Sequence, residues 1–141
     1  MSTHQFEKLF SSSDADALIP TLEVLIRDLQ SQAATLRDRI RELVRVDENV
    51  NSMRLSQIIE IHPELRPVTT RMAEIASQIE SLGCLLKDID LGLVDFPSEL
   101  GDEVVFLCWQ FGEPRVTTWH RIDSGFGDRQ PLPGARGTYL N

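Results

Sequence analysis

The chain has 141 residues, of which 41% are hydrophobic and 26% charged, the composition of one globular domain. Asp and Glu outnumber Lys and Arg and give a formal net charge of −8, so we expect neither nucleic acid nor a membrane as a partner. No apolar run approaches the roughly 20 residues that span a bilayer, and the first residues do not form a secretory signal. With only two cysteines and no disulfide framework, these features favour a cytoplasmic protein.

A long amphipathic helix is predicted from about residue 14. The residues before it supply N-caps, among them Ser11. From Leu18 to Leu43, apolar residues recur at steps of three and four, which is the spacing of one helix face and is typical of a coiled coil. Residues 47–51 do not continue the pattern and predict a turn.

A second helical period follows and ends before Gly83, a natural stop. Pro63 and Pro67 interrupt it, because proline lacks a backbone N–H and disfavours helix at the residue before it. We therefore expect a short helix over roughly 52–61, a kink, and a main helix over roughly 64–82.

The two segments predict an antiparallel helical hairpin over about residues 14–82. Its first helix, at about 33 residues, would be on the order of 50 Å long. Each helix of such a hairpin has only one neighbour, so part of its apolar face needs the second half of the chain or another molecule. We expect a homodimer with a four-helix interface.

The second half of the chain, over about 84–123, predicts a small antiparallel sheet. Two short apolar runs precede a loop over 97–102. Residues 103–111 and 115–122 then give the clearest hairpin signal, because both runs are rich in β-branched and aromatic side chains. The expected fold class is α+β, with the helical hairpin packed on the sheet. Residues 133–141 have the composition of a flexible tail.

The turn Gly112-Glu113-Pro114 predicts how the two hairpin strands pair. It places His120 opposite Val105, so that Cys108 lies on the other face of the sheet from His120. A Cys108–His120 nucleophile pair is therefore disfavoured, and Cys108 is expected to be a small buried residue.

Short motifs are distributed over the opening and the second half of the chain. They are Ala17-Leu18-Ile19-Pro20, Leu86-Lys87-Asp88-Ile89-Asp90, Gly92-Leu93-Val94-Asp95-Phe96-Pro97, Leu107-Cys108-Trp109, Gly112-Glu113-Pro114, Trp119-His120, Gly125-Phe126 and Arg129-Gln130-Pro131-Leu132. Together they resemble a family of bacterial proteins catalogued as domain of unknown function 2203. The resemblance covers most of the chain. It implies the family's fold and a bacterial origin but no reaction, because that family has no established activity.

His120 and nearby carboxylates form the sharpest candidate for a site. A metal ion needs three or four N, O or S ligands that converge on it. Asp90 and Asp95 precede the hairpin and would approach His120 if their segment pairs with it. We therefore predict His120, Asp90 and Asp95 as candidate metal ligands. The alternative is a histidine that is hydrogen-bonded within the sheet and has no ligand.

A wider ligand-binding set adds Trp109 and Arg129 to these residues. Arg129 lies in a glycine-rich turn that lacks the lysine and hydroxyl of a phosphate loop, so we expect no nucleotide site there. It is predicted instead to return to the sheet and to pair with Asp90, Asp95 or Glu113.

Two classes of function follow. The first is a non-catalytic, dimeric interaction or scaffold module, favoured because the sequence holds no complete catalytic constellation and the helices carry surplus apolar surface. The alternative is a small-ligand or metal-binding protein, with enzymatic activity left open and no cofactor identified. Its site would lie around Asp90, Asp95, Trp109, His120 and Arg129.

Overall fold

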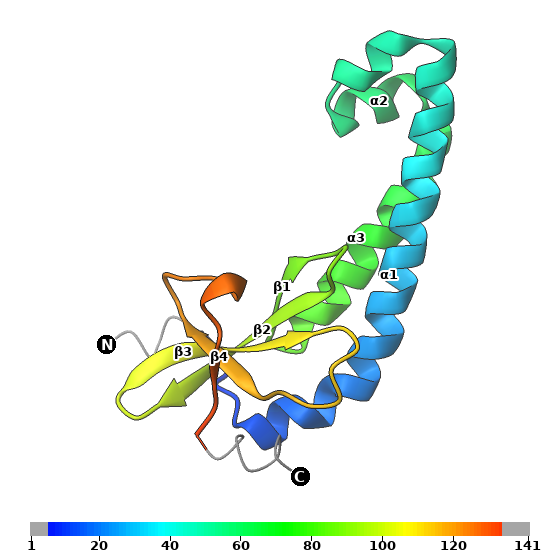
Figure 1. Cartoon of the computed structure of the whole chain (residues 1–141). Helices are drawn as coiled ribbons and strands as arrows, with labels where there is room; N and C mark the ends of the chain where they lie inside the picture. The colour runs from blue at the N-terminus through cyan, green and yellow to red at the C-terminus, as the bar shows by residue number, and fades with distance from the viewer. Residues whose placement is uncertain (1–5, 134–141) are drawn as a thin grey trace.

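A helical arm and a five-stranded sheet make up the protein, whose computed structural model describes residues 6–133 (Figure 1). The expected α+β class is confirmed. The tail expected over 133–141 lies outside the described residues except for Pro133. In chain order the elements are α1 (Ser12–Val46), η2 (Glu48–Ser52), α2 (Leu55–Ile61), η3 (Pro63–Leu65), α3 (Arg66–Ser81), β1 (Leu85–Asp88), β2 (Leu93–Leu100), β3 (Glu103–Gln110), β4 (Thr118–Arg121), η4 (Phe126–Asp128) and β5 (Gln130–Pro131).

α1 begins where the sequence provides a cap. The Ser11 hydroxyl accepts a hydrogen bond from the Asp14 backbone N–H at 3.0 Å, and the Asp14 carboxylate accepts one from the Ser11 backbone N–H at 3.1 Å. This reciprocal capping box satisfies two N–H groups at the start of the helix. α1 then continues for 35 residues, about 50 Å at the rise of an α-helix.

The interrupted second helix is as expected from its prolines. Pro63 begins η3 and Pro67 is the second residue of α3, two positions at which a helix needs no backbone donor. α3 then returns alongside α1 (Figure 1). Among residues 6–133, no helix is both long enough and apolar enough to cross a membrane.

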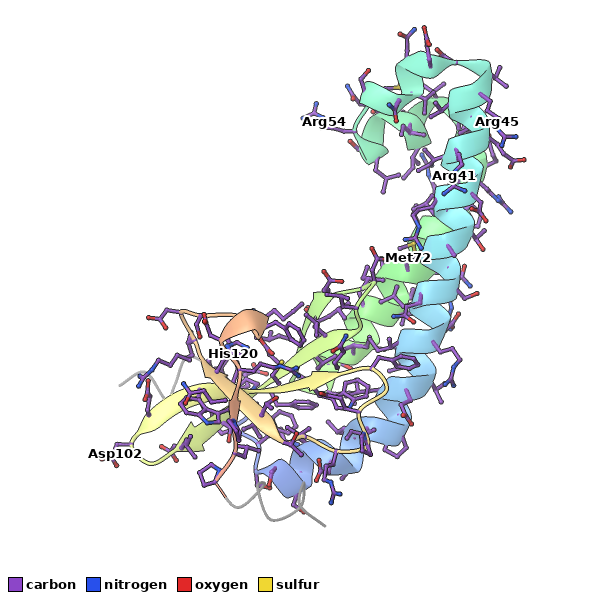
Figure 2. All side chains as sticks on the ribbon, in the orientation of Figure 1. Arg41, Arg45, Arg54, Met72, Asp102 and His120 are labelled. Carbon is purple, nitrogen blue, oxygen red and sulfur yellow. The ribbon has the colours of Figure 1, made fainter. Side chains whose placement is uncertain are left out.

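Two apolar clusters hold the helical arm, which consists of α1, α3 and the short helices between them. The sheet-side core joins α1 and α3 to one face of the sheet, and its members include Leu22, Ile26, Leu29, Ile75, Ile79, Val94, Phe96, Leu107 and Trp109. The arm-end core lies at the far end and consists of Leu36, Val50, Ile58, Leu65 and Val68. Met72, labelled midway along the arm in Figure 2, packs against both.

The sheet is an antiparallel meander in which each strand pairs with the next along the chain. β2 runs through Pro97 to Leu100, so the loop expected over 97–102 is wrong, and the turn contains only Gly101 and Asp102. β1 pairs with β2 only as far as Asp95, so β2 is an edge strand at Pro97, where no backbone donor is needed.

The predicted pairing of β3 with β4 is wrong by one residue. Phe106, rather than Val105, lies opposite His120, and Cys108 lies opposite Thr118. A shift of one residue turns every side chain of a strand to the other face. Cys108 and His120 therefore share the outer face of the sheet, which we define as the face away from the helices.

The cause of this difference lies in the connection between the two strands. The connection is a loop over residues 111–117, longer than the turn Gly112-Glu113-Pro114 alone, and β4 starts only at Thr118. The backbone N–H of Val116 donates to the Asp16 carboxylate of α1 at 2.7 Å. The loop is thus held by the helix, which the turn sequence alone does not indicate.

Candidate metal centre on the outer face of the sheet

Three neighbouring strands each contribute one buried polar side chain to the outer face. Asp95 of β2 lies directly opposite Cys108 of β3, and His120 of β4 lies two residues beyond the partner of Cys108. These side chains are only 3%, 1% and 3% exposed, and their ligand atoms all lie within 4.8 Å of one another. His120 is labelled in Figure 2, beside the turn drawn in orange.

Both ring nitrogens of His120 have partners. Nδ1 lies 2.8 Å from the Arg121 carbonyl oxygen, which can only accept, so Nδ1 carries a hydrogen and donates it. Nε2 lies 3.0 Å from the Asp95 carboxylate. If Nε2 is unprotonated, its lone pair faces an oxygen lone pair, an arrangement that repels unless a proton or a cation lies between the two atoms. The backbone thus fixes the tautomer that presents Nε2 to a metal ion.

Burial shapes the acid–base state of the other two groups. It raises the pKa of Asp95 above its ordinary value of 3.8, and the attraction of His120 offsets only part of this rise. Burial, and then the negative charge of Asp95, raise the pKa of Cys108 to about 12. Without a metal ion, Cys108 is therefore a thiol that donates to Asp95, and it is a poor nucleophile despite the nearby histidine.

The donor set matches the ligands that zinc prefers. Thiolate, imidazole and carboxylate are its common protein ligands, and a ligating histidine usually donates its second N–H to a backbone carbonyl, as His120 does to Arg121. Within the described residues, no other group of three or more His, Cys, Asp or Glu side chains lies close enough to hold one ion. Three protein ligands would leave a fourth position free on a tetrahedral ion.

A cavity of about 160 Å³ opens beside the three side chains. Its remaining lining residues are Lys87, Leu93, Ser124, Gly125 and Phe126.

The cover of this cavity, residues 122–129 with η4, is held in place by Arg129. The Arg129 guanidinium stacks 4.0 Å from the centre of the Phe126 ring. It also donates to the Glu113 carboxylate at 3.1 Å, and Glu113 is one of the three partners predicted for it. Arg129 therefore holds the cover in place. Among residues 6–133, it forms no hydrogen bond or ion pair with Asp95, Cys108 or His120.

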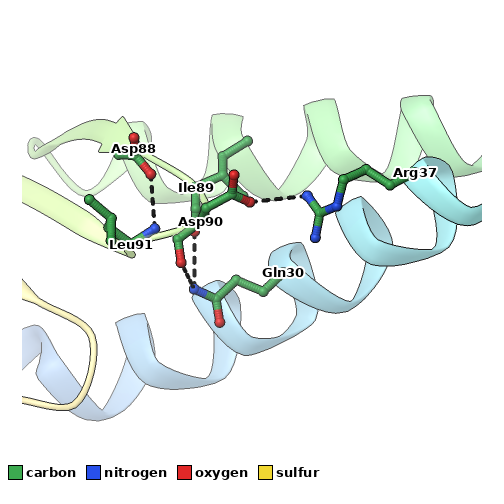
Figure 3. A network of polar contacts seen from close by, with 6 residues as sticks. All are labelled: Gln30, Arg37, Asp88, Ile89, Asp90 and Leu91. Carbon is green, nitrogen blue, oxygen red and sulfur yellow. Dashed lines mark hydrogen bonds and ion pairs between the residues drawn. The ribbon is translucent and has the colours of Figure 1, made fainter.

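Of the predicted metal ligands, the structure brings Asp95 and His120 together and places Asp90 elsewhere. Asp90 is exposed and pairs with Arg37 of α1 at 3.0 Å, as Figure 3 shows. Gln30 of α1 donates to the carbonyl oxygens of Ile89 and Asp90 at 3.0 and 3.1 Å. These contacts fix the β1–β2 turn on α1 and hold Asp90 on the helix side of the sheet.

Trp109, the remaining member of the predicted ligand-binding set, lies on the opposite face from the cavity. It is 0% exposed within the sheet-side core, and its indole N–H donates to the Glu113 carbonyl at 2.9 Å. Its role is to pack the sheet on the helices.

Sequence reasoning missed Cys108 and Lys87 as members of the site. Cys108 was assigned to the other face by the one-residue error in strand pairing. The buried Leu107-Cys108-Trp109 run alone does not indicate which face each side chain occupies. The position of Asp95 between Val94 and Phe96, in contrast, does signal a carboxylate on the opposite face of the strand from these two apolar side chains.

No curated protein and no solved structure matches the chain. One family profile does match, and it extends over residues 8–132, from before α1 to beyond β5. Every residue of the cluster and of its cover falls inside the matched range. The chain therefore belongs to the family of uncharacterised conserved proteins designated DUF2203.

Proposed function

We propose that the protein binds a divalent transition-metal ion, with zinc as the best match, through Asp95, Cys108 and His120. The observation that carries this proposal is the convergence of three buried donor atoms within 4.8 Å. The orientation of His120 supports it, since the Arg121 carbonyl already holds Nδ1 and leaves Nε2 to the ion.

Charge supports the same assignment. A buried carboxylate and a buried thiol are both unfavourable places for negative charge, which is why their pKa values are raised. A divalent cation would balance one carboxylate and one thiolate and leave the three-ligand centre neutral. Because Cys108 must lose its proton to bind, metal affinity should rise with pH.

The free fourth position separates this site from a purely structural one. Structural zinc sites are closed by four protein ligands, whereas exchangeable and catalytic sites keep one position for water or a ligand. The cavity beside the cluster supplies space for that position. The proposed class is therefore a small-ligand-binding metalloprotein.

The two cysteines provide a matched test of this function. Both are free and buried, and Cys84 donates to the Ile79 carbonyl at 3.3 Å, a bond that serine can keep. We expect wild-type protein and Cys84→Ser to take up one equivalent of Co²⁺ with a thiolate-to-cobalt absorption band, and Cys108→Ser to lose that band. A folded wild type without such a band, or a Cys108→Ser protein that keeps it, would contradict the proposal.

An interaction role for the helical arm is a second candidate, favoured by exposed apolar side chains at its far end. Val46 is 89% exposed at the end of α1, and Ile61 is 57% exposed at the end of α2. We expect self-association through this end, with a homodimer in light scattering at micromolar concentration. Ile61→Glu should shift that dimer towards the monomer, whereas a monomeric wild type would rule it out.

A further inference from the structure

Lys87 is a cation beside the candidate metal centre, and its charge attracts the buried Asp95 carboxylate without an ion pair between them. It lies in β1 and lines the same cavity as Asp95, Cys108 and His120. Its ammonium group lies 5.0 Å from the centre of the Phe106 ring, which stacks edge-on against His120 with centroids 5.6 Å apart. None of the ion pairs formed by the described residues includes Lys87, which is exposed.

The charges around the cavity favour an anion. A divalent ion with one carboxylate, one thiolate and one neutral imidazole has no net charge, and Lys87 adds one positive charge. A monoanion would therefore neutralise the site, with one oxygen in the fourth metal position and a charge-assisted contact to Lys87.

The size and walls of the cavity narrow the ligand further. Its volume of about 160 Å³ is small beside the 300–1,000 Å³ of pockets that hold drug-sized ligands. Leu93 and Phe126 offer apolar walls next to the polar cluster. A nucleotide is too large for this space, and a bare inorganic anion would leave the apolar walls without contacts.

We propose that the metal centre binds a small monocarboxylate with a short apolar chain, and that Lys87 recognises its negative charge. This inference rests on the proposed function, because the carboxylate is bound partly through the metal ion. Lys87 is a ligand-binding residue in this arrangement and does not coordinate the ion.

Propionate and propionamide provide matched probes, since they have nearly the same size and shape and differ in charge. The Co²⁺-loaded protein would be titrated with each, with the visible cobalt bands as the readout. We expect propionate to shift the bands in a saturable way and propionamide to have no effect at the same concentrations.

Two lysine variants then test the recognition of charge. Lys87→Met removes the charge but keeps the chain, and should weaken propionate binding about tenfold or more. Lys8→Met is the matched control, because the Lys8 ammonium also stacks on a phenylalanine, 4.6 Å from the centre of the Phe10 ring, but does not line the cavity. It should bind propionate as the wild type does.

The outcomes separate the two proposals. Absence of the thiolate-to-cobalt band in wild-type protein overturns the metal site and this inference with it. A normal band that propionate does not shift, equal binding of propionate and propionamide, or unchanged propionate affinity in Lys87→Met overturns only the carboxylate site.

Discussion

At Asp95, the charge state that favours the stability of the fold differs from the charge state that the proposed metal site requires. The side chain is 3% exposed, and burial raises its pKa even though His120 is in hydrogen-bond contact. The carboxylate is therefore unfavourable in the metal-free protein, while the same negative charge is what would attract a cation. Such a conflict between stability and binding is common at functional sites.

Replacement of this carboxylate should reveal the conflict. Because the folded-state pKa of Asp95 is raised, its contribution to stability is present below the ordinary value of 3.8 and is lost as pH rises through the folded-state pKa. Asp95→Asn removes this loss, and its amide can donate to Nε2 of His120. In chelator-treated protein at neutral pH, the thermal midpoint of Asp95→Asn should be at least that of the wild type and up to a few degrees higher. The difference between the two midpoints should grow as pH rises from about 4 through the folded-state pKa of Asp95.

Asp14 provides a control of opposite sign. Its hydrogen bonds to Ser11 lower its pKa, so its contribution to stability is present above the ordinary value and is lost as pH falls through the folded-state pKa. Asp14→Asn should therefore be less stable than the wild type at neutral pH and equal to it in acid. If both variants respond to pH in the same direction, the assignment of Asp95 is wrong.

At the scale of elements, the cover of the cavity depends on very few contacts. η4 is a single short turn, and no side chain within it is buried. Arg129 links it to the loop after β3 through Glu113 and to its own Phe126. We expect this turn to open more easily than the sheet beneath it.

Loss of the Arg129 contacts should speed the exchange of metal. An ion pair and a cation–π contact together contribute about 1–2 kcal/mol, so Arg129→Ala should raise the rate of Co²⁺ transfer to a chelator about tenfold. Arg121→Ala is the control, because the Arg121–Glu103 pair is more exposed and the Arg121 carbonyl that holds His120 is kept. Equal release rates in the two variants would show that the Arg129 contacts do not close the site.

The helices could be predicted from the sequence because their signals are local. The apolar spacing of α1, its cap at Ser11, and the prolines at the start of η3 and α3 all act within a few residues. The strand composition also predicted β3 and β4, whereas the second half of β2 was expected to be a loop and β5 was not predicted.

The pairing of β3 with β4 was not predictable in the same way, because the loop between them is longer than the motif Gly112-Glu113-Pro114 suggests. The same loop is bonded to a distant element, since Val116 donates to Asp16, one hundred residues away in the chain. Asp90 was misplaced for a similar reason, because Gln30 and Arg37 of α1 draw its turn towards the helix. Two of the three donors of the candidate site, Asp95 and His120, were therefore predicted from the sequence, while Cys108 was assigned to the wrong face.

At the scale of the whole molecule, the protein has two separate apolar cores along one long helix. The arm-end core and the sheet-side core share Met72 as a common contact, and the candidate metal centre belongs to the sheet end. The two ends should therefore lose structure separately.

Leu65→Ala tests this separation. Leu65 is 1% exposed in the arm-end core, so truncation should destabilise that end by about 2–5 kcal/mol. Hydrogen exchange should show lost protection in α2 and η3 but not in the sheet, and Co²⁺ uptake should be unchanged. Leu29→Ala, in the sheet-side core, should reduce protection in the sheet as well. Loss of sheet protection in Leu65→Ala would mean that the two cores unfold together.

The meander order of the strands also has a consequence for the sequence of events in folding. Asp95, Cys108 and His120 lie on consecutive strands, so their side chains meet through contacts between neighbouring hairpins. By contrast, the hydrogen bonds that Phe10 donates to Pro97 and Val116 donates to Asp16 close long loops of the chain. Short-range contacts form sooner than those that close long loops. We expect the three donors to assemble before the start of α1 docks, so that capture of a metal ion can accompany folding.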